Sequence, residues 1–222
     1  MNTDDLKRTR IKICCMSSVD EIRIAVRGGA DALGFVAEMP SGAGVIGEAL
    51  AAQLIPIVPP PVGTFLLTCE TDARRIVDQQ RRCDANTLQL CDRVTADARS
   101  LVCRQLPGIK IVQVVHVTGR ESVDEALAAQ ETSDAILLDS GNQSLPVKEL
   151  GGTGRVHDWA ISAEIREKLR VPIFLAGGLT PENVKEAIAA VRPYGVDVCS
   201  GLRTGGKLDR QKVEAFISAV TQ

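Results

Sequence analysis

The 222-residue sequence is poor in aromatic side chains and in histidine. Phe, Trp and Tyr together make up 3% of the residues, and two histidines occur. The chain also has no run of 18 apolar residues, and its N-terminus lacks the apolar stretch of a secretory signal. A formal net charge of −2 provides no long-range attraction to nucleic acid or to an anionic membrane. We therefore expect a cytoplasmic protein with neither a nucleic-acid partner nor a membrane partner.

The seven cysteines lack the spacing of a disulfide framework or a metal site. They are odd in number and scattered, none forms a C-x₂-C pair, and His116 and His157 lie far apart. We expect no metal, and because no glycine cluster has the G-x-G-x-x-G spacing we expect no nicotinamide or other cofactor. Most of the cysteines are interpreted as small buried apolar residues. The adjacent pair in "IKICCMSS" (11–18) remains open: half of a disulfide or metal site, two apolar fillers, or one reactive thiol beside an inert one.

Short β-branched runs alternate with helical patterns from one end of the chain to the other. Apolar runs such as "AILLD" and "PIFLA" are typical of strands that are buried on both faces. Eight strands are predicted, at 10–14, 31–36, 62–67, 87–91, 110–117, 135–139, 172–176 and 195–199. No linker divides the chain, so we predict one α/β domain over residues 1–222, a (β/α)₈ barrel.

Helix starts are marked by two capping signals. Ser18 and Glu21 have the spacing of a capping box before the first helix. Thr180 and Pro181 are predicted as the N-cap and first residue of the seventh helix. The second helix, near 47–53, has the weakest pattern.

Glycine pairs follow the last two predicted strands, in "LAGGLTPENV" and "CSGLRTGGK". Glycine lets backbone N–H groups approach an anion closely, and the loops after strands seven and eight of a barrel are a frequent phosphate site. Two such turns on consecutive strands favour a phosphate site over the alternative, in which the glycines only allow tight turns between strand and helix. A third cluster, "GGTGRVHDW" (151–159), follows the sixth strand and is interpreted as a loop able to close over the same mouth.

In these segments the chain resembles the phosphoribosylanthranilate isomerase family of tryptophan biosynthesis. The resemblance rests on "KIC", on "GADALGFV" (29–36), and on the block from "LLDS" (137–140) through "GGTG", "LAGGLTPENV" and "RPYGVDVCSG" (192–201). It implies an isomerase that acts, as a monomer or homodimer, on a phosphorylated sugar. The reaction it implies is an Amadori rearrangement, in which a base takes the C2 proton and an acid protonates the ring oxygen.

The resemblance also implies roles for individual residues. It assigns the base to Cys14 and the acid to Asp139, with Cys15 standing where the family usually has glycine. Phosphate contacts are implied for Gly177, Gly178, Ser200 and Gly201. Further substrate contacts are implied for Gln89 and Asp197.

The sequence departs from the family where the aromatic half of the substrate is expected. The Ser-Pro-Arg turn, whose arginine holds the anthranilate carboxylate, is replaced by small residues near Ala43, and no Arg or Lys lies between Arg27 and Arg74. The usual histidine after the fourth strand is Cys91, and the usual glutamate after the Ser-Gly pair is Arg203.

Three functions stay open at this point. In the first, the chain acts on phosphoribosylanthranilate, with Arg93 or Arg203 serving the carboxylate. In the second, a paralogous isomerase takes another phosphorylated aminosugar. In the third, the chain is a barrel that binds a phosphorylated ligand without catalysis, and Arg203 is a solvated loop charge.

Overall fold

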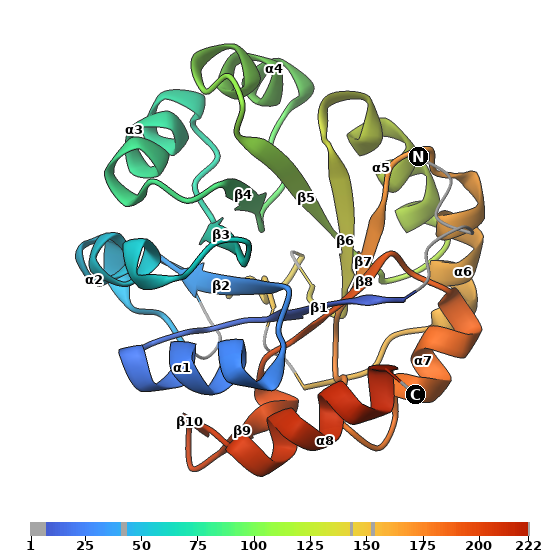
Figure 1. Ribbon diagram of the computed structural model, residues 1–222. Helices are drawn as coiled ribbons and strands as arrows, with labels where there is room; N and C mark the ends of the chain where they lie inside the picture. The colour runs from blue at the N-terminus through green and yellow to red at the C-terminus, as the bar shows by residue number, and fades with distance from the viewer. Residues whose placement is uncertain (1–7, 41–43, 143, 152–153, 222) are drawn as a thin grey trace.

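The protein, described by a computed structural model over residues 8–40, 44–142, 144–151 and 154–221, is a closed barrel of eight parallel strands (Figure 1). Neighbouring strands follow the order of the sequence, and β8 pairs with β1 through the register Ile13–Val198 to close the cylinder. The strands are β1 (Arg10–Ile13), β2 (Ala32–Val36), β3 (Gly63–Thr68), β4 (Thr87–Leu90), β5 (Lys110–His116), β6 (Ala135–Asp139), β7 (Ile173–Leu175) and β8 (Gly195–Val198). The predicted (β/α)₈ barrel is confirmed, and all eight strands lie within two residues of their predicted bounds.

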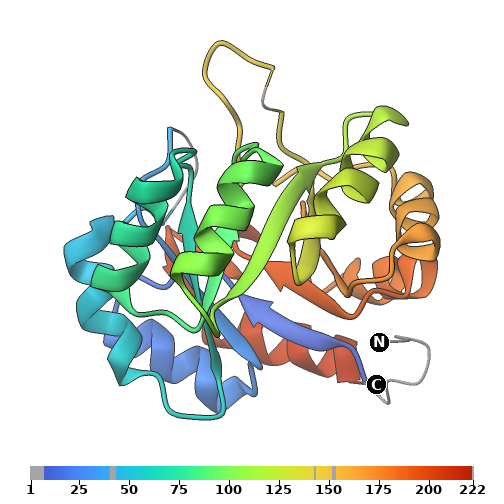
Figure 2. The same ribbon diagram turned by 90° about the horizontal axis from the view of Figure 1, so that it is seen from above.

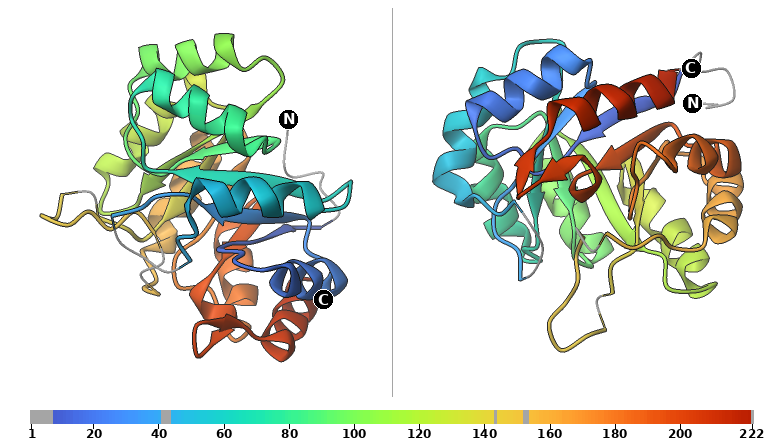
Figure 3. Two further views of the ribbon diagram at one scale, coloured as in Figure 1. Left: turned by 90° about the vertical axis from the view of Figure 1, so that its left-hand side faces the viewer. Right: turned by 90° about the horizontal axis from the view of Figure 1, so that it is seen from below.

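Within the described residues, eight α-helices surround the barrel, one after each of its strands (Figures 1 and 3). They are α1 (Val19–Gly28), α2 (Gly47–Leu54), α3 (Ala73–Cys83), α4 (Ala96–Gln105), α5 (Glu121–Ala129), α6 (Trp159–Lys168), α7 (Val184–Val191) and α8 (Arg210–Thr221). Short 3₁₀ turns occupy Ile55–Ile57, Gln130–Thr132 and Ser200–Leu202, and a small hairpin joins β9 (Arg203–Thr204) to β10 (Lys207–Leu208).

Apolar side chains fill two separate layers of the molecule. One layer lies between strands and helices and includes Ile11, Phe35 and Phe216, all fully buried. The other fills the inside of the barrel, where the ring of Phe174 makes edge-on contacts with Phe65 and Tyr194 at centroid distances of 5.9 and 5.5 Å. Because both faces of each strand are covered, the strands read as continuous apolar runs.

The capping predictions have different outcomes. Ser18 caps α1 and accepts the Glu21 N–H, while the Glu21 carboxylate accepts the Ser17 N–H. The prediction for the seventh helix is wrong: α7 begins at Val184, with Asn183 as its N-cap residue. Residues 180–183 form a turn, in which the Asn183 side chain accepts the Thr180 N–H and donates to the Gly178 carbonyl. The Thr180 carbonyl accepts the N–H groups of Asn183 and Val184, so this turn leads directly into the helix.

The loops at the carboxyl ends of the strands differ greatly in reach. The longest connection follows β6, and its gold ribbon projects beyond the rest of the barrel in Figure 2. An antiparallel bridge between Asn142 and Glu149 draws its two limbs together. Over the part of the chain that the structure describes, no helix has the length and apolarity needed to cross a membrane.

Candidate active site

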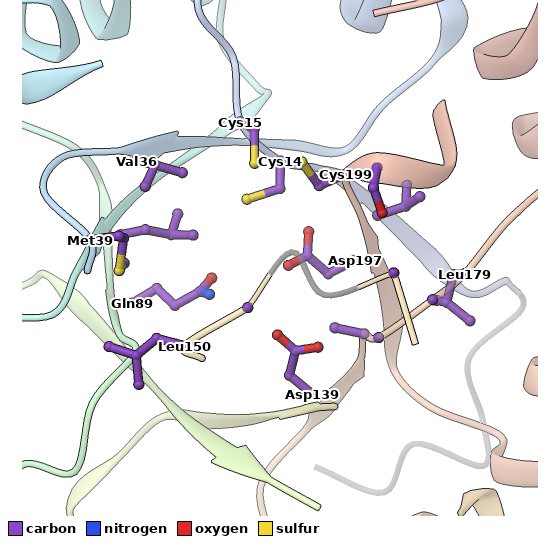
Figure 4. A pocket seen from close by; sticks show the side chains of 18 residues that line it. Cys14, Cys15, Val36, Met39, Gln89, Asp139, Leu150, Leu179, Asp197 and Cys199 are labelled. Carbon is purple, nitrogen blue, oxygen red and sulfur yellow. The ribbon is translucent and has the colours of Figure 1, made fainter. Parts of the chain in front are cut away.

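The candidate site is a cavity at the carboxyl ends of the strands, where barrel enzymes carry their catalytic groups (Figure 4). It measures about 660 Å³ when the part open to solvent is included. Its wall combines polar groups, thiols, glycines and apolar side chains, among them Cys14, Cys15, Val36, Met39, Leu67, Gln89, Asp139, Leu150, Gly177, Gly178, Asp197, Cys199 and Ser200. Most of the residues singled out from the sequence therefore converge on one cavity.

Cys14 and Asp139 lie on different walls of this cavity and face each other across it in Figure 4. Cys14 directly follows β1, and its N–H donates to the Val198 carbonyl at 2.8 Å, which anchors it to the neighbouring strand. Asp139 is the last residue of β6, and its Oδ1 accepts the Ser140 N–H at 2.7 Å. Both side chains are buried. A thiol and a carboxyl group are thus held at opposite sides of a space in which a small ligand can lie between them.

Two buried oxygen atoms of the cavity residues lack a hydrogen-bond donor within the described part of the chain. They are Oδ1 of Asp197, on β8, and Oε1 of Gln89, on β4. Because a buried acceptor without a donor is costly, such atoms mark places where a ligand supplies hydroxyl or N–H groups. The residues predicted as further substrate contacts therefore line the cavity, and each has a buried acceptor without a donor.

The glycine-rich side of the cavity is formed by the turns after β7 and β8. Gly177 and Gly178 have φ values of +84° and +63°, which other residues rarely adopt. Among the described residues, no hydrogen bond is recorded for the backbone N–H groups of Gly177, Gly178, Ser200 and Gly201. Gly201 does not line the cavity; a β-carbon there would collide with the Leu179 carbonyl oxygen, so its glycine permits the two turns to touch.

The loop after β6 adds groups that the sequence reasoning did not assign. Leu150, Gly151 and Gly154 line the cavity, and a β-carbon on Gly178 would lie 2.6 Å from the carbonyl carbon of Arg155. The glycines of "GGTG" are the sequence feature from which this loop was predicted to lie at the mouth of the barrel. Residues 152 and 153 of that motif lie outside the described residues.

Three thiols gather on one wall, from β1 and from the turn after β8 (Figure 4). Hydrogen bonds with Cys14 and Cys199, together with burial, raise the pKa of Cys15 well above its usual value. The bond from Cys15 and the charge of Arg203 lower the pKa of Cys199, although burial opposes them. Cys15 has φ +69°, the left-handed conformation for which glycine is the usual residue. Cys91 belongs to the apolar layer that fills the inside of the barrel, and burial raises the pKa of its thiol well above the usual value.

Neither arginine proposed for a substrate carboxylate lines the cavity. The Arg203 guanidinium donates to Glu21 at 2.7 Å and to the carbonyls of Cys15 and Gly206. Arg93 pairs with Glu125 at 2.7 Å on the surface. The side of the cavity away from the glycine turns is instead apolar, and none of the described residues that line the cavity is Lys, Arg or His.

One charged residue next to the site was missed. Lys12, on β1, is fully buried and its Nζ donates to Asp197 Oδ2 at 2.8 Å. The available signal was a lysine between the two apolar residues Ile11 and Ile13 of "RIKIC". Over the described residues, no group of three or more His, Cys, Asp or Glu side chains is arranged to hold a metal ion.

Comparison with known proteins identifies relatives along almost the whole chain. The family model described as N-(5'-phosphoribosyl)anthranilate (PRA) isomerase matches residues 11–219. The N-(5'-phosphoribosyl)anthranilate isomerase of Methanothrix thermoacetophila is 37% identical over 217 residues, which cover 96% of this chain and 98% of that protein.

Solved structures agree with the sequence relatives. Phosphoribosyl anthranilate isomerase from Thermotoga maritima superimposes with a TM-score of 0.82 at 30% identity, covering 96% of this chain and 98% of that one. A phosphoribosyl anthranilate isomerase in complex with reduced 1-(o-carboxyphenylamino)-1-deoxyribulose 5-phosphate superimposes with a TM-score of 0.80 at 28% identity and the same coverage. From the barrel, the site at its mouth and these matches, we conclude that the chain belongs to the N-(5'-phosphoribosyl)anthranilate isomerase family.

Proposed function

We propose that the protein is a phosphoribosylanthranilate isomerase of tryptophan biosynthesis, with Cys14 as general base and Asp139 as general acid. The observation that carries the proposal is the placement of this thiol and this carboxyl group on opposing walls of one cavity. Relatives that carry this activity in their names support the choice of reaction. The chemistry needs a base and an acid on opposite sides of a sugar, and this arrangement provides both.

The reaction proceeds in two proton transfers. Asp139 gives its proton to the ring oxygen as the bond between that oxygen and C1 breaks, and the nitrogen lone pair forms a C=N bond at C1. The Cys14 thiolate then takes the proton from C2, and the C–H electron pair forms a C1=C2 bond as the C=N electrons return to nitrogen. The resulting enol tautomerises to the 1-amino-1-deoxyketose.

Polar groups around the pair match the rest of such a substrate. The unpartnered Asp197 Oδ1 and Gln89 Oε1 accept sugar hydroxyl or amine N–H groups. The backbone N–H groups of Gly177, Gly178, Ser200 and Gly201 are placed to hold the phosphate, with Gly201 contributing from just outside the cavity wall. Arg203 has no part in this proposal because Glu21 holds its guanidinium.

A second candidate is an isomerase for an aminosugar phosphate whose nitrogen substituent carries no carboxylate. It is favoured by the far side of the cavity, where Val36, Met39 and Leu150 lie and where none of the lining residues that the structure describes is a cation. The two candidates predict different substrate preferences. The kcat/KM of phosphoribosylanthranilate and of its phosphoribosylaniline analogue should differ by at least about tenfold if a carboxylate is recognised, and should be similar if it is not.

Steady-state kinetics with phosphoribosylanthranilate test the proposal. We expect Cys14→Ala and Asp139→Asn each to lower kcat by at least about a hundredfold, since general acid–base groups contribute 10²–10⁴-fold. Matched controls are Cys103→Ala, on the exposed side of α4, and Asp134→Asn, just before the opposite end of β6, where it pairs with Lys110. Both controls should turn over normally. Normal turnover by Cys14→Ala would contradict the assignment of Cys14 as the base. Binding without any turnover by the wild type would favour a non-catalytic barrel.

A further inference from the structure

The ammonium group of Lys12 lies beneath the candidate site, out of contact with water. Lys12 lies on β1, and Cys14 directly follows this strand in extended continuation. Because the two residues are two positions apart, their side chains project to the same, inner side of the barrel. The Lys12 side chain has no exposed surface, and its Nζ lies 5.2 Å from the centre of the Phe65 ring. Lysine is almost never fully buried without a partner, so this position calls for an explanation.

Its partner is Asp197, and the pairing leaves half of that carboxylate unused. Lys12 Nζ donates to Oδ2 at 2.8 Å, while Oδ1 has no donor among the described residues and belongs to a cavity-lining side chain. Burial acts to lower the pKa of Lys12, but the charges of Asp197 and Cys14 outweigh it and raise the pKa. The lysine therefore stays protonated and fixes the carboxylate with one oxygen free for a ligand.

The same ammonium also lies beside the Cys14 thiol, because Gly34 leaves room for both. A β-carbon on Gly34 would lie 2.7 Å from Cys14 Sγ and 3.2 Å from Lys12 Nζ. Sulfur and nitrogen therefore occupy the two sides of one small space on β2, and their separation cannot exceed the sum of these distances. At such separations an ammonium group and a thiolate attract each other.

Stability does not account for the buried pair. Replacing a buried ion pair with apolar side chains of similar size is often neutral or stabilising, since desolvation offsets the attraction between the charges. A pair retained directly under a proposed catalytic thiol is better explained by what it does to the site.

We propose that Lys12 is a positioning residue for the isomerisation: its ammonium stabilises the thiolate of Cys14 and holds Asp197 with Oδ1 directed at the substrate. The inference rests on the proposed role of Cys14 as the base. Other titratable groups face the thiol from several elements, and within the described chain none of them is a cation; they are Cys15, Cys91, Asp139, Asp197 and Cys199. Lys12 is therefore the cation that faces this group of thiols and carboxyl groups.

The test compares two variants that differ only at residue 12. In Asp197→Asn the lysine is present, and in Lys12→Met/Asp197→Asn it is absent without leaving a buried carboxylate unpaired. The measurement is the rate of Cys14 alkylation by iodoacetamide against pH, followed by fragment-ion mass spectrometry that separates Cys14 from Cys15. We expect the double variant to react at least about tenfold more slowly near neutral pH, with its profile displaced to higher pH. Superimposable profiles would overturn the inference.

The pH dependence of kcat/KM provides a second measurement, because a purely structural role of Lys12 would not shift it along the pH axis. The acid limb of kcat/KM against pH should lie at higher pH in the double variant than in Asp197→Asn, whereas a loss of packing alone would lower activity equally at every pH. If Cys14→Ala abolishes turnover and the two profiles coincide, the Lys12 inference fails while the proposed function stands. If Cys14→Ala turns over normally, the proposed function fails, and the alkylation profiles still report on the ammonium.

A measurement on the wild type covers the case in which the double variant does not fold. In ¹⁵N-lysine-labelled protein, a buried ammonium exchanges slowly with water and gives a signal distinct from those of surface lysines. This signal should shift over the same pH range in which Cys14 becomes reactive, and the shift should vanish once Cys14 is alkylated. If the chemical shift of this signal does not change when Cys14 ionises or is alkylated, the inference is overturned.

Discussion

At the scale of single residues, the environment of each thiol decides its chemistry. Cys14, Cys15 and Cys199 share one wall of the cavity, yet the hydrogen bonds among them separate their properties. Cys15 donates and is kept protonated, whereas Cys199 accepts and lies near the Arg203 guanidinium. These contacts identify Cys15 as the inert thiol of the adjacent pair, and the reactivity of Cys14 stays a prediction.

We predict that Cys199 is alkylated by iodoacetamide well before Cys15 and Cys91. The thiolate is the reacting form, and the pKa is lowered for Cys199 but raised well above the usual value for the other two. Peptide mapping at neutral pH measures the order of labelling. Because Cys199 lies beside Cys14, the assay must assign the label to peptides that contain one thiol or the other. A bound phosphorylated ligand should protect both thiols from alkylation. Labelling of Cys91 ahead of Cys199 would contradict the prediction.

At the scale of elements, one ion pair joins α1 to the β9–β10 hairpin. Glu21 accepts Arg203 and the Leu208 N–H, and both charged side chains are 8% exposed. Burial acts to raise the pKa of Glu21, but the hydrogen bonds from Arg203, Leu208 and Ser17 outweigh it and lower the pKa. Arg203 is thus a structural residue that ties the turn after β8 to the first helix.

We predict that Glu21→Gln lowers the free energy of unfolding by about 3 kcal/mol, because it leaves the Arg203 charge buried without a partner. A carboxylate with a lowered folded pKa contributes stability that is complete above its unfolded value, about 4.3, and is lost as the pH falls through the folded pKa. The difference between wild type and variant should therefore shrink below about pH 4. Urea unfolding at two pH values measures it. Glu164→Gln, on the surface, should leave the unfolding midpoint almost unchanged at both.

The strands were predictable and the start of α7 was not. Strands buried on both faces have apolar runs that local inspection detects, so the eight predicted segments match the eight observed. Thr180 and Pro181 carry a valid start signal, but residues 181–183 form a turn, bonded through Asn183 to Gly178 and Thr180, and the helix begins three residues later. The residue at which α7 begins depends on the position of the preceding glycine turn in the folded chain, and a local sequence pattern does not predict that position.

At the scale of the whole molecule, closure of the barrel brings the ends of β1, β4, β6, β7 and β8 to one mouth. Close contact between loops completes the site. Gly178 sits against Arg155 and Val156 of the loop after β6, and Gly201 sits against Leu179. The loops therefore form one packed rim rather than separate turns.

We predict that Gly178→Ala lowers kcat/KM by about a hundredfold or more. The new methyl group would lie 2.6 Å from the Arg155 carbonyl carbon and would displace the loop after β6 from the phosphate side. Gly205→Ala is the matched control, since it also has positive φ but has no neighbour within 4 Å. The control should cost about 1 kcal/mol of stability and leave the kinetics unchanged. Equal kinetic effects in the two variants would contradict the prediction.

The sequence by itself determined the barrel and the glycine-rich turns, because buried strands and tight turns leave local patterns. The resemblance to a known family, and no local pattern, pointed to the thiol of Cys14 and the carboxyl group of Asp139. The tertiary structure decided the partners of charged groups. It assigned Arg203 to Glu21, Arg93 to Glu125 and Lys12 to Asp197. Long charged side chains reach across elements that are far apart in sequence, and the lowest-energy pairing depends on burial and distance in the folded chain.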